Sequence, residues 1–286
     1  KEGLIVNKIS KVYGILNGTT NYILSLMEKS GKSFQDVLEK AKKLGFAESN
    51  PISDLNGSDS ASKLRILSSI SFNKYISKNK ILTEGIQNIN LTDIYHAKRL
   101  GYKIKLLSIS EVKKNKLMER VHPYLVLNSS YIAKIDGVLN AIVIDGHPVG
   151  RSILQGEGAG PGPTTSALIS DLCSIIKGDV RHPFGVSSTK RKMIPKFDII
   201  NHSCSSYLRI EVKDIPGVLS SITKIFATNK ISIKNLIQDP DKKNKIATII
   251  IITHESFEKN FSKLISDLTR NKFVSKRPTF IRVEKI

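Results

Sequence analysis

The fold of the C-terminal part is decided by residues 207–226, YLRIEVKDIPGVLSSITKIF. Its opening segment, YLRIEVK, alternates polar and apolar side chains, which predicts a strand. Asp214-Ile215-Pro216-Gly217 comes next and predicts a turn, because aspartate, proline and glycine favour reversals of the chain. The apolar residues after the turn recur at helical spacing: Val218, Leu219, Ile222, Ile225 and Phe226. The stretch therefore predicts a strand, a tight turn and a helix in direct succession.

The residues that follow, up to 286, continue this alternation. KISIKNLIQ and KIATIIIIT predict two strands around the polar turn DPDKKN, and TFIRVEKI predicts a last strand. A second helix is predicted before that last strand by a further apolar stripe: Phe257, Phe261, Leu264, Ile265 and Leu268. The resulting order βαββαβ is typical of the ferredoxin-like fold.

Residues 1–178 predict a mixture of strands and helices. A strand is expected over 1–16, and strands of an antiparallel sheet in KIKLLSISEV, KLMERVHPYLVL and GVLNAIVIDGHPVGRSIL. Helices are expected from Thr19 or Thr20, over 33–44 with Ser33 as cap, around Asp59 and Lys63, over 91–100 and over 163–177. We therefore predict an α+β chain with a first domain over 1–180, a linker over 181–204 and a second domain over 205–286.

The helix predicted to follow DLNGS (54–58) carries Asp59 and Lys63, four residues apart. Side chains at this spacing share a helix face, and Ile66, Leu67 and Ile70 fall on the same face, so the charged pair is expected to point inward. Charges directed inward are costly unless they are paired or used in chemistry. A lysine can act as acid or base beside a carboxylate that orients it. The alternative is an ordinary solvated loop, with Glu48 and Asp54 among its charges.

A second candidate feature is the stretch GEGAGPG (156–162), which precedes the last helix of the first part. Such a stretch can let a phosphate or a cofactor approach the backbone, but on this pattern alone a flexible turn is the favoured interpretation. A dinucleotide fingerprint, G-x-G-x-x-G after a strand with an acidic residue about 20 positions later, is absent from the sequence.

Composition argues against a membrane protein, a secreted protein and a disulfide-rich protein. The 286 residues are 40% hydrophobic, without an apolar run long enough to span a membrane and without a signal-peptide pattern, which predicts a cytoplasmic protein. Cys173 and Cys204 give no disulfide framework, and Cys173, on an apolar helix face, is expected in the core. The six histidines show no metal-ligand spacing, so no metal site is predicted.

Five stretches in the first part, taken in order, resemble homoserine dehydrogenase. They are GILNGTTNYIL, GFAESNPISDLNGSDSASKLRIL, LGYKIKLL, VHPYLV and GEGAGPGPTTSALISDL, and the resemblance covers residues 1–178. The C-terminal part, with Asp214 to Gly217 on its first turn, resembles an ACT domain, which some homoserine dehydrogenases carry after the catalytic region. The resemblance implies a catalytic domain with an antiparallel sheet and helices, followed by a ferredoxin-like ACT domain.

The resemblance also implies a reaction, the NAD(P)H-dependent interconversion of L-aspartate 4-semialdehyde and L-homoserine, which leads to threonine, isoleucine and methionine. Lys63 is similar to the acid/base of the family, and Asp59 to a substrate-site carboxylate that also orients Lys63. The remaining expected roles follow the same motifs. Glu48, Asp54, Gly18 and Thr19 correspond to substrate-binding positions, and Gly160 to a glycine near the nicotinamide.

The family begins with a Rossmann domain, which also supplies a second functional lysine and the carboxylate of a sodium or potassium site. None of these is found in this sequence. The chain is therefore expected to be the C-terminal part of an enzyme, to bind NAD or NADP poorly alone, and to expose the apolar side of helix 163–177. The sequence does not decide between the two cofactors.

The ACT resemblance implies sensing of an amino acid, with threonine as the first candidate. Asp214, Gly217 and, on the facing strand, Asn235 would form that site, and a homodimer or homotetramer is expected. A purely structural pairing module is the alternative for this domain. For the whole chain, the alternative is a non-catalytic amino-acid-sensing fragment that lacks the nucleotide-binding domain.

A third possibility is RNA binding, since the net charge is +20 and RNA-recognition motifs share the βαββαβ order. Those motifs stack bases on aromatic side chains of a central strand, and KIATIIIIT has none. The lysines are also spread along the whole chain. We therefore expect no specific nucleic-acid partner.

Overall fold

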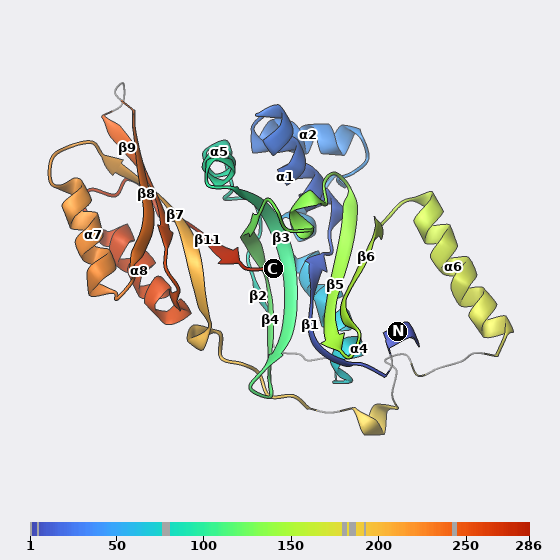
Figure 1. The fold of residues 1–286 in the computed structure, drawn as a ribbon. Helices are drawn as coiled ribbons and strands as arrows, with labels where there is room; N and C mark the ends of the chain where they lie inside the picture. Colours follow the sequence, from blue (N-terminus) through green and yellow to red (C-terminus); the bar gives the residue numbers. More distant parts are fainter. Residues whose placement is uncertain are drawn as a thin grey trace. The chain divides into compact units, whose positions relative to one another are not determined.

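The computed structural model describes residues 2–4, 6–75, 81–178, 182, 187–191, 193–241 and 245–286. The chain forms two compact units (Figure 1). The first contains residues 1–87, 105–123 and 131–197, and the second contains 88–104, 124–130 and 198–286. The predicted boundaries at 180 and 205 stay a prediction, but residues 88–104 and 124–130 pack with the C-terminal part.

The first unit is built on an antiparallel arrangement of long strands. Its strands are β1 (Lys8–Ile15), β2 (Leu82–Thr83), β5 (Leu139–His147), β6 (Gly150–Glu157) and parts of β3 (Tyr102–Lys113) and β4 (Lys116–Leu127). Neighbouring strands follow the order β6-β5-β1-β3-β4. β1 pairs antiparallel with β3 and β5, and β5 pairs antiparallel with β6, while the short β2 runs parallel to β4. The predicted antiparallel sheet is therefore present.

Four helices of this unit surround the candidate site or lead to it. They are α1 (Gly18–Ser30), α2 (Phe34–Lys43), α3 (Ile52–Leu55) and α4 (Ser58–Phe72). Ser33 caps α2, as predicted, by accepting a hydrogen bond from the backbone N–H of Asp36. The cap of α1 is Asn17, not Thr19 or Thr20, because the Asn17 side chain accepts from the N–H of Thr20. The helix therefore begins earlier than expected.

Helix α4 presents a different face to the interior than its apolar pattern predicts. Ser60, Leu64, Ser68 and Ser69 are buried, whereas Ile66 is 51% exposed. The hydroxyls of Ser68 and Ser110 on β3 lie 2.8 Å apart, so small polar side chains let the helix approach the strand closely. The inward orientation expected for Asp59 and Lys63 is therefore wrong. The pair lies at the rim of the packed face.

The last helix of the first unit, α6 (Pro161–Ile176), has no buried residue. Its apolar side chains Leu168, Ile169, Leu172, Ile175 and Ile176 are each more than half exposed. This agrees with the expectation of an exposed apolar side. Cys173 is exposed as well, so its predicted place in the core is wrong.

The second unit has the predicted βαββαβ order. It consists of β7 (Ser203–Lys213), α7 (Val218–Thr228), β8 (Ile233–Asp241), β9 (Ile246–Thr253), α8 (Glu258–Arg270) and β11 (Thr279–Glu284), with the two-residue β10 (Ser256–Phe257) before α8. The strands follow the order β11-β7-β9-β8 with antiparallel neighbours. Asp239 to Asp241 belong to β8, and the rest of the predicted turn DPDKKN, 242–244, lies outside the described residues.

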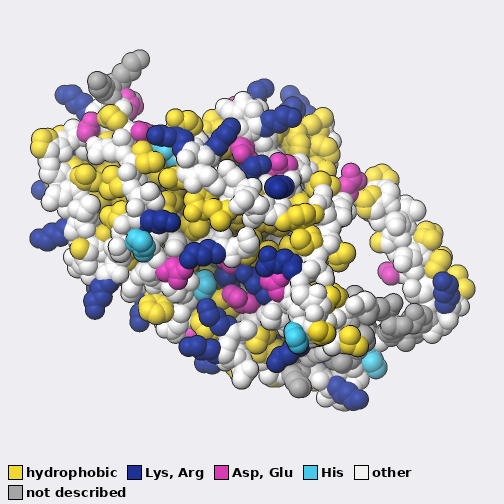
Figure 2. All heavy atoms as spheres, viewed as in Figure 1, with side chains coloured by type: hydrophobic (Ala, Val, Ile, Leu, Met, Phe, Trp, Pro, Cys, Tyr) yellow, Lys and Arg dark blue, Asp and Glu magenta, His cyan; other side chains and the backbone are white. Residues whose placement is uncertain are grey.

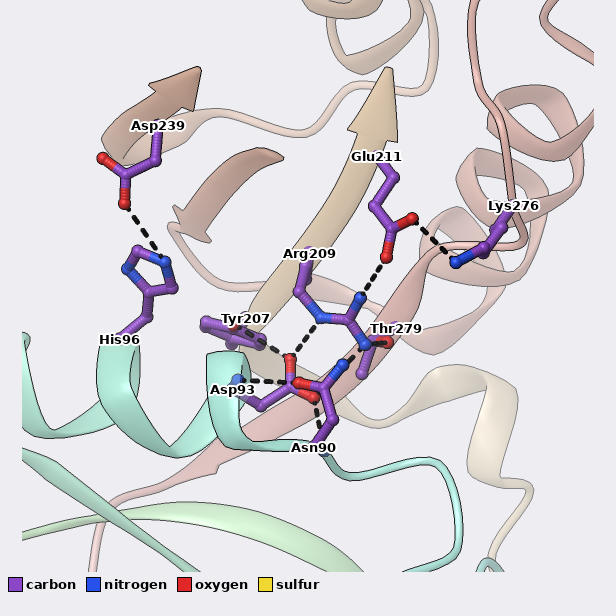
Figure 3. Close-up of polar contacts among 9 residues, drawn as sticks. All are labelled: Asn90, Asp93, His96, Tyr207, Arg209, Glu211, Asp239, Lys276 and Thr279. Carbon is purple, nitrogen blue, oxygen red and sulfur yellow. Dashed lines mark hydrogen bonds and ion pairs between the residues drawn. The ribbon is translucent and has the colours of Figure 1, made fainter. Parts of the chain in front are cut away.

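One face of this sheet is covered by α7 and α8, and their side chains build an apolar core with alternate residues of β7 and β9. The opposite face carries Tyr207 and Arg209, and it packs against α5 (Leu91–Arg99). Figure 3 shows the contact. Arg209 donates to the buried carboxylate of Asp93 through Nε (2.7 Å), and the Tyr207 hydroxyl donates to the same carboxylate at 3.1 Å.

The carboxylate of Asp93 also closes the capping box at the start of α5. It accepts from the backbone N–H of Asn90, whose side chain accepts from the N–H of Asp93. About one turn further along α5, His96 lies 3.3 Å from a carboxylate oxygen of Asp239 on β8. Burial lowers the pKa of His96 and outweighs the attraction of Asp239. α5 is therefore attached to two strands of the C-terminal sheet.

Among the helices that the structure describes, none has both the length and the apolar character to cross a membrane. On the face seen in Figure 2, lysine and arginine side chains are dispersed among acidic and apolar ones. This distribution agrees with the spread of basic residues along the sequence and offers no continuous basic track on that face.

Candidate active site

The candidate site gathers three segments of the first unit around the side chain of Asn17. The amide Nδ2 of Asn17 donates to Asp54 Oδ1 at 2.8 Å and to Asp59 Oδ2 at 2.9 Å. Asp59 Oδ2 in turn lies 2.9 Å from Lys63 Nζ. The segments before α1, in α3 and at the start of α4 thus bring two carboxylates, one amide and one amine together.

The Asp59–Lys63 ion pair lies within one turn of α4, at the predicted spacing. Lys63 also donates to the backbone carbonyl of Leu16 at 3.3 Å, which ties its side chain to the end of β1. The side chain of Lys63 is half exposed and that of Asp59 is 28% exposed. A solute can therefore reach both groups. The carboxylate of Asp59 is also favoured in the first turn of a helix, where backbone N–H groups point outward.

Gly57 explains why α3 and α4 present their carboxylates on the same side. It stands between the two helices with φ of 82°, in the left-handed region that favours glycine. A Cβ atom there would lie 3.1 Å from Cγ2 of Thr83 and 3.4 Å from the carbonyl oxygen of Glu84. Glycine at this turn lets the chain change direction in close contact with β2. Asp54, before the turn, and Asp59, after it, can therefore both contact Asn17.

The other predicted substrate residues border this group. Gly18 follows Asn17 directly, and the hydroxyl of Thr19 donates to the carbonyl oxygen of Phe46 at 2.7 Å. That bond holds the loop after α2 against the start of α1. Glu48, two residues beyond Phe46, is exposed, and no contact joins it to the Asn17 group in the described structure.

The glycine-rich loop lies beside the same region. A Cβ atom on Gly158 would come within 1.9 Å of the Asn140 side-chain nitrogen, and one on Gly18 within 2.6 Å of the carbonyl oxygen of Val138. Residues 138–140 of β5 and the segment before it therefore lie between the loop and the start of α1. Gly160 caps α6 with φ of 114°, again a conformation that favours glycine.

The start of α6 is poorly suited to hold a phosphate. Pro161 and Pro163 carry no backbone N–H, and the N–H of Thr164 donates to the carbonyl of Gly160. Helix N-termini bind phosphates through such N–H groups. Around Gly160 the backbone is open, since only Cδ of Pro163 lies within 4 Å of a Cβ atom there, whereas Asn140 fills the space at Gly158.

Asn17 is the member of the site that sequence reasoning missed. It lies 37 and 42 residues from Asp54 and Asp59 in the chain, so no local spacing connects them. The available signal was the stretch LNGTTN, in which an asparagine precedes a helix and can cap it. In the described parts of the chain, no group of three or more His, Cys, Asp or Glu side chains is placed to hold a metal ion.

A second site is a cavity in the second unit, of about 380 Å³, within the range of small-molecule sites. It is lined by the turn from Lys213 to Gly217, the start of α7, Ile249 on β9 and Gln238 on β8. The predicted residues Asp214 and Gly217 are therefore among its walls. Asn235 pairs with Ile252, whereas Gln238 pairs with Ile249. Since side chains alternate along a strand, Asn235 faces the opposite side of the sheet.

Comparison with known proteins confirms the resemblance noted in the sequence for each of the two parts of the chain. A family model described as homoserine dehydrogenase matches residues 1–173, and an ACT domain model matches residues 206–272. A homoserine dehydrogenase of Neisseria gonorrhoeae is 36% identical over 294 residues, which cover 100% of this chain and 67% of that protein. One of Helicobacter pylori is 40% identical over 285 residues, covering 99% of this chain and 67% of that protein.

Solved structures agree. The crystal structure of a homoserine dehydrogenase from Thiobacillus denitrificans superimposes with a TM-score of 0.90 at 37% identity, covering 99% of this chain and 66% of that chain. A homoserine dehydrogenase from S. aureus superimposes with a TM-score of 0.70 at 32% identity. The chain thus spans about two thirds of the length of the proteins that it matches.

Proposed function

Since this chain belongs to the homoserine dehydrogenase family, we propose that it forms the substrate-binding, catalytic and regulatory parts of an enzyme that interconverts L-homoserine and L-aspartate 4-semialdehyde. The observation that carries the proposal is the accessible Asp59–Lys63 pair, which Asn17 joins to Asp54. The reading as an amino-acid sensor without catalysis is less favoured, because the matched enzymes are similar to this chain over its whole length.

The substrate is an amino acid, so its ammonium group needs carboxylates and its hydroxyl needs a base. We assign the ammonium group to Asp54 and Glu48, since carboxylates accept the strongest hydrogen bonds from such cations. Gly18 and Thr19 form the adjoining wall. In this arrangement the hydroxyl of homoserine points to Lys63.

In the oxidation of homoserine, the amine of Lys63 acts as the base and accepts the hydroxyl proton as the carbon gives up a hydride. The oxygen keeps the electron pair of the O–H bond and becomes the aldehyde carbonyl. In the reverse direction, Lys63 returns a proton to that oxygen. Asp59 keeps the amine directed at the reacting oxygen through the 2.9 Å contact. Such acid–base assistance contributes about 10²- to 10⁴-fold in rate.

The family uses NAD(P), which when bound accepts or supplies the hydride. One of the similar solved structures is a homoserine dehydrogenase mutant in complex with NADPH, which makes NADPH the first cofactor to try. We propose that this chain contributes the Gly158–Gly160 loop beside the nicotinamide, with Gly160 as the predicted contact. A sodium or potassium ion is proposed only for the full-length enzyme, because in the family its carboxylate ligand belongs to the Rossmann domain.

The test is Lys63→Ala in the full-length protein that carries this chain. We expect homoserine-dependent reduction of NADP⁺ to fall by about 10²- to 10⁴-fold, with an unchanged melting temperature. Lys63→Arg should not rescue activity, because a guanidinium does not give up its proton near neutral pH. Lys43→Ala, at an exposed position of α2, is the matched control and should keep full activity. Normal turnover in Lys63→Ala would refute the assignment.

We propose further that the cavity of the second unit binds an amino-acid effector, with threonine as the first candidate. Asp214 and Gly217 line it, and the first turn of α7 presents backbone N–H groups to a carboxylate. Addition of threonine to the full-length protein should raise its melting temperature and change its rate.

Two variants on β8 show which face of the sheet is used. Gln238→Ala removes a side chain from the cavity wall, and Asn235→Ala removes one from the other face. Loss of the threonine effect in Gln238→Ala alone supports the cavity. Loss in Asn235→Ala alone would move the effector to the opposite face and to a homodimer contact.

We also propose that the enzyme works as a homo-oligomer in the cytoplasm. The family and the ACT domain support the first part. Cys173 and Cys204, both free thiols, suit a reducing compartment. Size-exclusion chromatography with light scattering of the full-length protein tests the number of copies.

A further inference from the structure

We infer that Asn17 is a positioning residue for the reaction: its side-chain amide fixes Asp54 and Asp59 relative to each other and thereby directs Lys63. This inference rests on the proposed function, because it gives Asn17 a part in the same site. Asn17 is 4% exposed, so its amide is buried, and its contacts with the partly exposed Asp54 and Asp59 are partly shielded from water. In such surroundings a hydrogen bond is electrostatically stronger than in water.

The orientation of the Asn17 amide is determined by its partners. Its Oδ1 accepts from the backbone N–H of Thr20 at 2.9 Å, and its Nδ2 faces Asp54 Oδ1 and Asp59 Oδ2. A flipped amide would place its oxygen against two carboxylates and its nitrogen against an N–H donor. The NH₂ group has two hydrogens, one for each carboxylate. One side chain thus caps α1 with one end and joins two acidic residues with the other.

The contact with Asp59 connects Asn17 to the proton-transfer step. Asp59 Oδ2 receives Asn17 Nδ2 from one side and Lys63 Nζ from the other, at 2.9 Å each. A carboxylate held at both places cannot rotate freely, so the direction of the Lys63 amine is set before substrate arrives. Without the amide, the negative charges of Asp54 and Asp59 lose their common donor, and the pair repels.

The simpler interpretation is that Asn17 only caps α1. The two roles use different atoms, so they can be separated. Asn17→Asp and Asn17→Ser both keep an oxygen that can cap the helix. Both lose the NH₂ donor, and only Asn17→Asp adds a negative charge. A residue that only caps would tolerate both changes.

The experiment measures homoserine oxidation by the full-length protein and these two variants as a function of pH. We expect kcat to fall about 10- to 100-fold in Asn17→Ser, because hydrogen bonds to charged groups are the stronger ones and two of them are lost. In Asn17→Asp we expect a larger fall. The pH midpoint of the rate should also move upward there, because an added negative charge beside an amine favours its protonated form. Parental kcat and an unshifted profile in both variants would overturn the inference.

Ser33→Ala is the control for the loss of a cap alone. Ser33 caps α2, away from the carboxylates, by accepting from the N–H of Asp36. Its loss should lower the melting temperature and leave the pH profile unchanged. If Ser33→Ala moved the pH profile as Asn17→Asp does, the profile would report stability, and the inference would fail.

A second measurement does not need activity. The side-chain NH₂ resonances of Asn17 are followed by NMR in ¹⁵N-labelled protein and in Asp54→Ala and Asp59→Ala. Each substitution should move the resonance of the proton that faced the lost carboxylate. If neither moves it, the contact is absent in solution and the inference is overturned. If both move it while the parent protein does not oxidise homoserine, the proposed function fails and the contact remains.

Discussion

Gly14 shows how one residue can determine the packing of the first unit. It lies in β1 opposite Ser108 of β3 and Ile142 of β5. A Cβ atom there would lie 1.9 Å from the carbonyl oxygen of Ala141, a backbone atom that cannot turn away. The strand that leads to Asn17 can therefore keep its pairing with β5 only if this residue has no side chain.

We predict that Gly14→Ala destabilises the protein by about 1–3 kcal/mol, because the added methyl group forces the paired strands apart. Chemical denaturation monitored by circular dichroism measures the change. Gly162→Ala is the control, since nothing lies within 4 Å of a Cβ atom there. It should be neutral or stabilise by up to about 1 kcal/mol. Equal stability of Gly14→Ala and the parent would contradict the close approach of the strands.

Single residues also show what the sequence could reveal of the site. Asp59 and Lys63 could be found because their relation is local, one helical turn. Asn17 could not, because it meets Asp59 through the tertiary fold. The inward direction of the pair was predicted wrongly. Helix α4 turns its small serine side chains toward β3, and not its apolar stripe, because serines allow the closer approach.

At the scale of elements, α5 is held to β7 by one buried ion pair. Asp93 is fully buried, and Arg209 contacts it through both Nε and Nη2. The same carboxylate caps α5, so the start of the helix and its attachment depend on one side chain. The βαββαβ order was predictable from local patterns, but the contact with α5 was not, because it joins residues 116 positions apart.

We predict that Arg209→Met destabilises the protein by about 3–5 kcal/mol, because it leaves the Asp93 carboxylate buried without its cation. Asp93→Asn combined with Arg209→Met should cost less than the sum of the two single changes, since no buried charge then remains unpaired. Arg277→Met, at an exposed position, is the control and should change little. Additive effects of the two changes, measured by urea denaturation, would argue against a coupled pair.

At the scale of the whole molecule, the two units are interleaved in the sequence. The second unit takes residues 88–104 and 124–130 from within the first part of the chain. The sequence predicts a boundary near residue 205, because a segment rich in proline, serine and basic residues ends there and the strand–helix alternation of the second domain begins. The contribution of α5 has no such signal, since its own pattern is that of an ordinary short helix.

We predict that a fragment of residues 205–286 is less stable than the same region within the chain. The fragment lacks α5, so Tyr207 and Arg209 lose their partner Asp93. Adding a peptide of residues 88–104 should raise its melting temperature, and the same peptide with Asp93→Leu should not. A fragment that melts identically with and without the peptide would contradict this prediction.

The place of α5 has a consequence for protein engineering. A designer who wishes to change the proposed amino-acid effector would exchange the ACT domain for one from another protein. If the graft starts near residue 205, it leaves the host's Asp93 facing a foreign strand that has no arginine to meet it. A working chimaera must therefore transplant two separate pieces, 88–104 together with the C-terminal sheet, or preserve Tyr207 and Arg209 in the donor.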